Sequence, residues 1–164
     1  MPAGIHFIPI AVEQVASEDA FRDAGQFLQD EVLQGEETIL LVDDEEMIIN
    51  MAGRILARLG YESAFARNGS EAVALYEEAL KTEQPFDAVV LDLTVRGGMG
   101  GEEAMRHLLE IDPQAKVIVS SGYSDSPVMQ NYKQYGFSAA TGKPYSLIEL
   151  SQALDRVLNP STAM

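Results

Sequence analysis

The stretch Ile39-Leu40-Leu41-Val42-Asp43-Asp44-Glu45 decides the fold. Four consecutive aliphatic residues, apolar at odd and even positions alike, indicate a β-strand covered on both faces, which is typical of parallel sheets. The run changes abruptly to acidic residues, so a group of carboxylates follows the carboxyl end of this strand. Further apolar runs of the same kind occur at residues 88–91 and 117–119, and weaker candidates at residues 63–66 and 139–141.

Helical patterns separate these apolar runs. Apolar residues at spacings of three and four predict helices over residues 47–59, 70–80, 104–111, 126–135 and 146–158. Ser70 is the expected cap of the second helix, and Ser146-Leu147-Ile148-Glu149 is a capping box for the last. Five strands alternating with five helices predict an α/β fold: a doubly wound, five-stranded parallel sheet in three layers.

The composition restricts the classes of function. The chain has 164 residues, with 11 Lys and Arg against 26 Asp and Glu, which gives a formal charge of −15. Because nucleic acids and anionic membranes attract basic surfaces, no nucleic acid and no membrane are expected as partners. The absence of Cys excludes disulfides and Cys-ligated metals, and a cytoplasmic location is expected. No apolar run reaches the ~18 residues that span a bilayer.

The charge is unevenly distributed and suggests three segments. Residues 1–36 contain seven acidic residues and one basic residue, Arg22. Ser17 as a cap and Gly35 as a terminator predict a helix in this acidic leader, which either packs on the main domain or links it to another; a partly ordered extension is the alternative. Residues 37–158 form the domain, and residues 159–164 a short tail.

Polar residues follow the predicted strands at their carboxyl ends, where ligands bind in open α/β sheets. Asp43-Asp44, Asp92, Ser120-Ser121 and Lys143-Pro144 occupy these positions. Taken singly, each has an ordinary structural interpretation, as a helix start, a turn or a surface charge; Glu45 keeps that interpretation. Together, carboxylates at one edge suit Mg²⁺, and a nucleophilic Asp with a Lys and a hydroxyl suits phosphoryl transfer.

Four segments resemble one known family. They are Leu40-Leu41-Val42-Asp43-Asp44-Glu45, Val90-Leu91-Asp92-Leu93-Thr94, Val119-Ser120-Ser121-Gly122-Tyr123 and Gly142-Lys143-Pro144-Tyr145. In order and spacing they resemble the receiver domain of two-component response regulators, over roughly residues 37 to 158. The resemblance implies a flavodoxin-like sheet with strand order 2-1-3-4-5. It also implies that Asp92 is the phosphoacceptor, and that Mg²⁺ is held by Asp43, Asp44, Asp92 and the Thr94 carbonyl.

The remaining motif positions partly match the family. By resemblance, Ser121 is the switch hydroxyl, Lys143 pairs with phosphoryl oxygens, and the Lys143-Pro144 bond is cis. Two positions depart from the pattern. The loop 93–101 carries four glycines and one extra residue, as in receivers attached to hybrid sensor kinases, and Ala140 stands where the family has a switch aromatic. The usual coupling of hydroxyl and ring is therefore in question.

Several functions compete. The leading hypothesis is a phosphoacceptor module in a phosphorelay, not an enzyme with an external substrate, whose partner is a histidine kinase or a histidine phosphotransfer protein. An alternative is the terminal receiver of a hybrid sensor kinase, since residues 4–10 resemble the closing strand of a kinase ATP domain and only six residues follow Leu158. A pseudo-receiver that binds without phosphorylation is another. A phosphatase of the haloacid dehalogenase type is disfavoured, because Thr94 replaces its second Asp. The oligomeric state stays open, a homodimer included.

Overall fold

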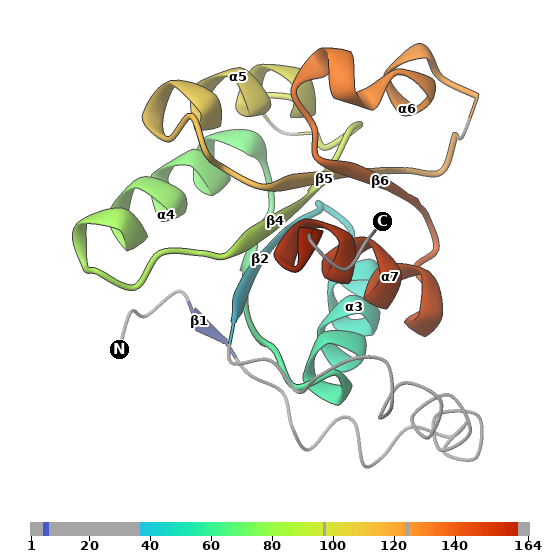
Figure 1. Ribbon diagram of the computed structural model, residues 1–164, viewed down its shortest axis with the longest axis horizontal. Coiled ribbons are helices and arrows are strands. Elements are labelled where there is room, and N and C mark those ends of the chain that lie inside the picture. Colours follow the sequence, from blue (N-terminus) through green and yellow to red (C-terminus); the bar gives the residue numbers. More distant parts are fainter. Residues whose placement is uncertain (1–4, 7–36, 97, 124, 161–164) are drawn as a thin grey trace.

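The computed structural model describes residues 5–6, 37–96, 98–123 and 125–160. Its centre is one sheet with strand order β1-β3-β2-β4-β5-β6 (Figure 1). The strands are β1 (Ile5–His6), β2 (Thr38–Val42), β3 (Glu62–Ala66), β4 (Ala88–Asp92), β5 (Val117–Ser121) and β6 (Ala139–Gly142). From β2 to β6 all pairings are parallel, which confirms the predicted five strands in the order 2-1-3-4-5.

The five predicted strands do not include β1; residues 4–10 resemble a strand of a kinase ATP domain instead. In the structure, β1 pairs antiparallel with the outer edge of β3, with Ile5 opposite Ala64 and His6 opposite Ser63. Two residues are too few to show a strand periodicity, so the pattern of the sequence could not indicate it. The helix expected between Ser17 and Gly35 lies outside the described residues.

The helices follow the predicted order. They are α3 (Glu46–Arg58), α4 (Gly69–Lys81), α5 (Gly101–Ile111), α6 (Pro127–Gln130), the 3₁₀ helix η1 (Tyr132–Tyr135) and α7 (Leu147–Leu158). The Ser146 hydroxyl accepts a hydrogen bond from the Glu149 N–H at 3.1 Å, so Ser146 is the cap that the sequence predicts. For α4 the prediction is wrong. Asn68, not Ser70, is the N-cap, because its side chain accepts from the Glu71 N–H at 2.9 Å.

The predicted helix 126–135 is also wrong as a continuous element. It consists of the single turn α6 followed by η1. Asn131 leaves the helical conformation at the junction, and its side-chain amide donates to the Pro127 carbonyl at 3.1 Å. Such a local bond competes with helix continuation, and apolar spacing does not register it. Gly136 ends η1 with φ +94°.

Helices cover both faces of the sheet and make three layers. On one face, α4, α5 and α6 pack on side chains that include Leu40, Val89 and Val119. On the other face, α3 and α7 pack on the alternate side chains, including Leu41, Val90 and Ile118 (Figure 1). This alternation explains why the strands are apolar at every position. In the described ranges, no helix combines the length and the apolar character that a membrane span requires.

Candidate functional site

Parallel pairing brings the carboxyl ends of four strands to one edge of the sheet. Asp43 directly follows β2, and Asp92 is the last residue of β4. Ser121 ends β5, and Lys143 directly follows β6, where the Lys143-Pro144 peptide bond is cis as expected. The predicted site residues therefore share one edge, as the rule for open α/β sheets requires.

Three carboxylates form the centre of this edge. Asp43, Asp44 and Asp92 each contribute an oxygen, and these oxygens lie within 4.8 Å of one another. Asp43 is 0% exposed and Asp92 1% exposed, whereas Asp44 is more open to solvent. Buried like charges at this separation repel, so the arrangement is costly unless cations lie among them. The donor set therefore fits a hard, oxygen-binding cation such as Mg²⁺.

One protein cation already contacts this cluster. The Lys143 Nζ lies 2.8 Å from Asp43 Oδ2 and 3.2 Å from Asp92 Oδ2. Burial lowers the pKa of the Lys143 ammonium, but the hydrogen bond to Asp43 and the charges of Asp92 and Asp43 outweigh this and raise it. Lys143 therefore stays protonated and can donate to an anionic group. Glu45, whose sequence position indicates an ordinary helix-start acid, lies 3.9 Å from the same Nζ.

Asp92 is chemically the most distinct acid of the cluster. Burial, followed by the nearby Asp43 carboxylate, raises the pKa of its carboxyl, although Lys143 and the Thr94 N–H act in the opposite direction. Thr94 donates to Asp92 Oδ1 from its backbone N–H at 3.2 Å and from its hydroxyl at 3.3 Å. One carboxylate oxygen is thus fixed by Thr94 and the other by Lys143, so the carboxylate has one defined orientation.

A comparison with protein families agrees with this geometry. The family model for the response regulator receiver domain matches residues 39–155, most of the chain. The chain belongs to this family. It is therefore a receiver domain of two-component signalling, as the four sequence motifs predict.

Individual relatives support the assignment. The chemotaxis protein CheY of Thermotoga maritima is 34% identical over 120 residues, which cover 73% of this chain and 95% of CheY. Sensor kinase CckA of Brucella abortus is 31% identical over 154 residues, which cover 93% of this chain and 16% of the kinase. The solved receiver domain of a sensor histidine kinase from Pseudomonas aeruginosa has the same fold, with TM-score 0.66, 24% identity, and coverage of 76% of this chain and 98% of that domain.

Ser121 lies at the same edge of the receiver domain but is bonded locally. It is 1% exposed, and its hydroxyl accepts a hydrogen bond from the Tyr123 N–H at 3.0 Å. Among the described residues, its hydroxyl has no hydrogen bond to Asp43, Asp44, Asp92 or Lys143, here called the Asp–Lys cluster. The link to that cluster runs through the backbone, because the Lys143 N–H donates to the Ser121 carbonyl at 3.0 Å.

The glycine-rich loop after Asp92 is held close to its neighbours. A Cβ on Gly101 would lie 2.9 Å from the Asp92 carbonyl oxygen, and one on Gly69 would lie 2.5 Å from the Met99 carbonyl oxygen. The Gly69 N–H donates to that Met99 oxygen at 3.0 Å. Gly101 in the loop and Gly69 at the start of α4 therefore permit close backbone approach, which joins the loop after Asp92 to the start of α4.

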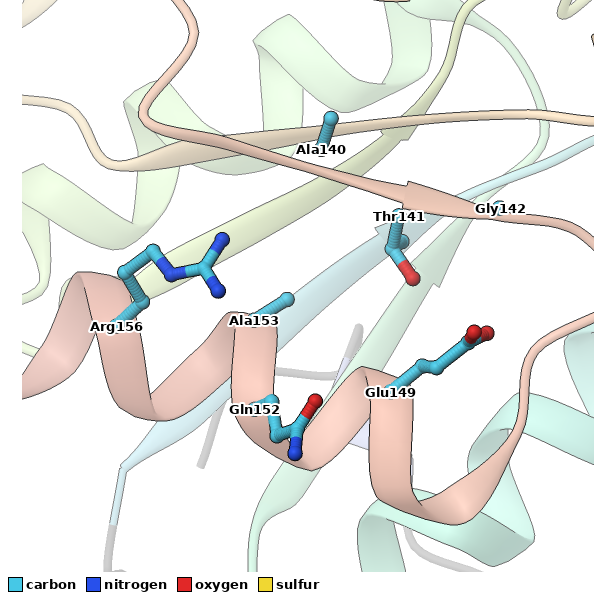
Figure 2. A pocket seen from close by; sticks show the side chains of 7 residues that line it. All are labelled: Ala140, Thr141, Gly142, Glu149, Gln152, Ala153 and Arg156. Carbon is cyan, nitrogen blue, oxygen red and sulfur yellow. The ribbon is translucent and has the colours of Figure 1, made fainter. Parts of the chain in front are cut away.

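The departure at Ala140 is located on β6. Ala140 is partly buried and packs toward the α4–α5–α6 face of the sheet. Beside it, β6 and α7 border a cavity of about 180 Å³, here called the β6–α7 hollow (Figure 2). It is lined by Ala140, Thr141, Gly142, Glu149, Gln152, Ala153 and Arg156.

The polar groups of the β6–α7 hollow differ from those of the Asp–Lys cluster. Arg156 and Glu149 extend from opposite ends of one flank of α7 (Figure 2) and form no ion pair with any described residue. The Thr141 hydroxyl is buried and has no hydrogen-bond partner among the described residues. The charged groups of Arg156 and Glu149 are therefore open to solvent and make no ion pair within the described residues.

Sequence reasoning missed one buried contact near the site. The Tyr145 hydroxyl lies 2.8 Å from the Ser120 hydroxyl, and both side chains are buried. Each residue alone has an unremarkable position, one inside an apolar strand and one after Lys143-Pro144. The available signal was Ser120, a polar residue within the fully buried strand β5, because a buried hydroxyl requires a partner.

Proposed function

We propose that this receiver domain accepts a phosphoryl group on Asp92 from a histidine kinase or a histidine phosphotransfer protein. The observation that carries the proposal is the contact of Lys143 with both buried carboxylates, at 2.8 Å to Asp43 and 3.2 Å to Asp92. A buried, oriented carboxylate beside a fixed ammonium is the arrangement that nucleophilic phosphoryl transfer needs.

A divalent cation belongs to the proposal. Oxygens of Asp43, Asp44 and Asp92 are close enough to share one ion, and by family resemblance the Thr94 carbonyl adds a further ligand. The Pseudomonas receiver described above is reported with a magnesium ion coordinated in its active-site cleft. When bound, Mg²⁺ neutralises the negative charge that a phosphoryl group brings to three acids.

In the proposed reaction, one Asp92 carboxylate oxygen attacks the phosphorus of a phosphohistidine on the partner. A P–O bond forms and the P–N bond breaks, and the imidazole leaves with the electron pair and takes up a proton. Lys143, which holds Asp92 before transfer, donates to a phosphoryl oxygen afterwards, and the Ser121 hydroxyl can donate to another. Hydrolysis reverses the state: water attacks phosphorus, the P–O bond to Asp92 breaks, and inorganic phosphate leaves.

The protein context proposed here is a hybrid sensor kinase. The similarity to CckA covers 154 residues, whereas only 128 residues run from Glu37 to Met164. The similarity therefore extends into the acidic leader, ahead of the receiver domain. A leader shared with a sensor kinase supports the interpretation that it connects this domain to a kinase, and an isolated receiver would not require it.

A pseudo-receiver is the competing function, and the departure at Ala140 favours it. The two are separated by incubating the protein with Mg²⁺ and acetyl phosphate and measuring intact mass. We expect a gain of one phosphoryl group, sensitive to hydroxylamine and absent in Asp92→Asn. Asp87→Asn, at the opposite end of β4, is the matched control and should still be modified. An unmodified wild type would overturn the proposal in favour of a pseudo-receiver. A modified Asp92→Asn would overturn it by placing the phosphoryl group on another residue.

A further inference from the structure

A buried hydrogen bond involves Ser120, the residue of β5 that stands opposite Asp92 in the sheet. It joins the hydroxyls of Tyr145 and Ser120, which are 2.8 Å apart and 25 residues apart in sequence. Tyr145 is 5% exposed and Ser120 0% exposed, so water does not compete for this bond. Burial raises the pKa of the Tyr145 hydroxyl; the hydrogen bond to Ser120 opposes this and the nearby Asp43 and Asp92 charges add to it, so the group stays protonated.

Ser120 of β5 lies between β4, which carries Asp92, and β6, which precedes Lys143. It stands opposite Asp92 in the ladder between β4 and β5, and its carbonyl accepts from the Leu93 N–H at 2.9 Å. On its other side it stands opposite Thr141 of β6. A bond to the Ser120 side chain therefore acts on a residue that is already fixed relative to Asp92.

The segment that carries Lys143 is tied to β5 at two points. The Lys143 backbone N–H donates to the Ser121 carbonyl at 3.0 Å, and the Tyr145 hydroxyl bonds to the Ser120 hydroxyl. These ties bracket Pro144 and hold the backbone of Lys143 against two successive residues of β5. If the second tie is removed, only the first of these two hydrogen bonds to β5 remains.

We propose that Tyr145 is a positioning residue for phosphoryl transfer, which acts through Ser120 to hold Lys143 over Asp43 and Asp92. This inference rests on the function proposed above. Because Tyr145 directly precedes Ser146, the N-cap of α7, the same bond also fixes where α7 begins. A change in the separation of β5 and the Lys143 segment is thus conveyed to α7, which gives this domain a coupling route that does not need a ring at residue 140.

The test compares Tyr145→Phe, Ser120→Ala and the double variant in the full chain. The rate of Asp92 modification by acetyl phosphate is measured over a range of Mg²⁺ concentrations. We expect each single variant to lower the maximal rate by about threefold to tenfold, the effect of one hydrogen bond on a barrier. The Mg²⁺ concentration at half-maximal rate should stay the same, because the carboxylates are intact. The double variant should lose no more than either single variant.

Tyr76→Phe is the matched control. Its hydroxyl also forms a part-buried bond, to Asp112 Oδ2 at 2.7 Å, but this bond joins α4 to the end of α5. It should lower the free energy of unfolding and leave the maximal rate unchanged. If Tyr145→Phe is modified as fast as wild type, or if its loss is additive with that of Ser120→Ala, the positioning role is wrong while the proposed function stands. A wild type that is not modified overturns both.

Discussion

Two regions border β6, here called its two flanks: the Asp–Lys cluster at its carboxyl end and the β6–α7 hollow along its side. Their charged side chains differ in the contacts that they make. At the carboxyl end of β6, Lys143 contacts Asp43 and Asp92, and the surrounding hydrogen bonds leave each carboxylate oriented. Along the side of β6, the β6–α7 hollow holds Arg156 and Glu149 without an ion pair in the described part of the chain. The first flank carries the family motifs and the second the departure at Ala140. Chemistry that depends on fixed geometry restricts its residues, whereas an open surface leaves them free to differ.

Exchanging the cation on each flank should give the largest contrast. Lys143→Met removes a donor to the phosphoryl oxygens and should lower the rate of Asp92 modification by about a hundredfold. Arg156→Met removes a cation of similar size from the hollow and should change that rate by less than about twofold, since nothing on this flank touches the reacting atoms. Phosphorylation by acetyl phosphate, followed by intact mass over time, measures both. Equal losses would remove the distinction between the flanks.

Mg²⁺ binding should depend on the acids of the Asp–Lys cluster and not on the acid of the hollow. Mg²⁺ at a hundred times its dissociation constant should raise the free energy of unfolding by about 2.7 kcal/mol, because only the folded chain gathers the three carboxylates. Asp44→Asn should move the titration to higher Mg²⁺ concentrations, and Glu149→Gln in the hollow should not. Urea unfolding at a series of Mg²⁺ concentrations measures the effect. A wild type whose stability ignores Mg²⁺ would contradict the metal assignment.

Substitutions of Gly101, beside Asp92, and of Gly142, on the hollow, test how closely the backbone is packed in the two regions. In Gly101→Ala the new Cβ meets the backbone of Asp92 and Leu93 at 2.9 Å, and the free energy of unfolding should fall by about 2 kcal/mol. In Gly142→Ala, on the hollow, the Cβ meets nothing within 4 Å. That variant should stay within about 0.5 kcal/mol of wild type by urea unfolding. A tolerant Gly101 would mean that the loop after Asp92 is not closely packed.

Two buried hydroxyls give the smallest and most specific contrast. Ser120→Ala leaves the Tyr145 hydroxyl without its partner and should cost about 1 kcal/mol in the free energy of unfolding. Thr141→Val removes a buried hydroxyl that has no partner among the described residues, and should be neutral or stabilise by up to about 1 kcal/mol. Urea unfolding in the absence of Mg²⁺ compares them. Destabilisation by Thr141→Val would show that its hydroxyl is in fact bonded.

The sheet and the acids could be predicted because their signals are local and follow a general rule. Runs such as 39–42 and 88–91 identify buried parallel strands, and ligands collect where such strands end. The rule therefore places Asp43, Asp92 and Lys143 at one edge of the sheet, and no side-chain geometry is needed for that prediction. The metal-ligand and catalytic roles given to these residues, and to Ser121 and Thr94, stay predictions until phosphorylation is measured.

The features that escaped prediction depend on individual side chains. The choice of Asn68 over Ser70 as a cap is decided by which oxygen reaches the Glu71 N–H, and both residue types are good caps. The break between α6 and η1 depends on the Asn131 bond to Pro127. The Tyr145–Ser120 pair joins residues too far apart in sequence for any periodicity to connect them.

The antiparallel strand β1 has a consequence for how copies of this chain meet one another. An uncovered strand at the border of a sheet is a template on which another chain can add by backbone pairing. β1 covers part of β3 and is itself one border of the sheet, so among the described residues the two border strands are β1, with only two residues, and β6. Strand β6 is four residues long and is soon followed by Pro144, which has no N–H to donate. The sheet therefore offers few free backbone groups on which another chain could pair edge to edge.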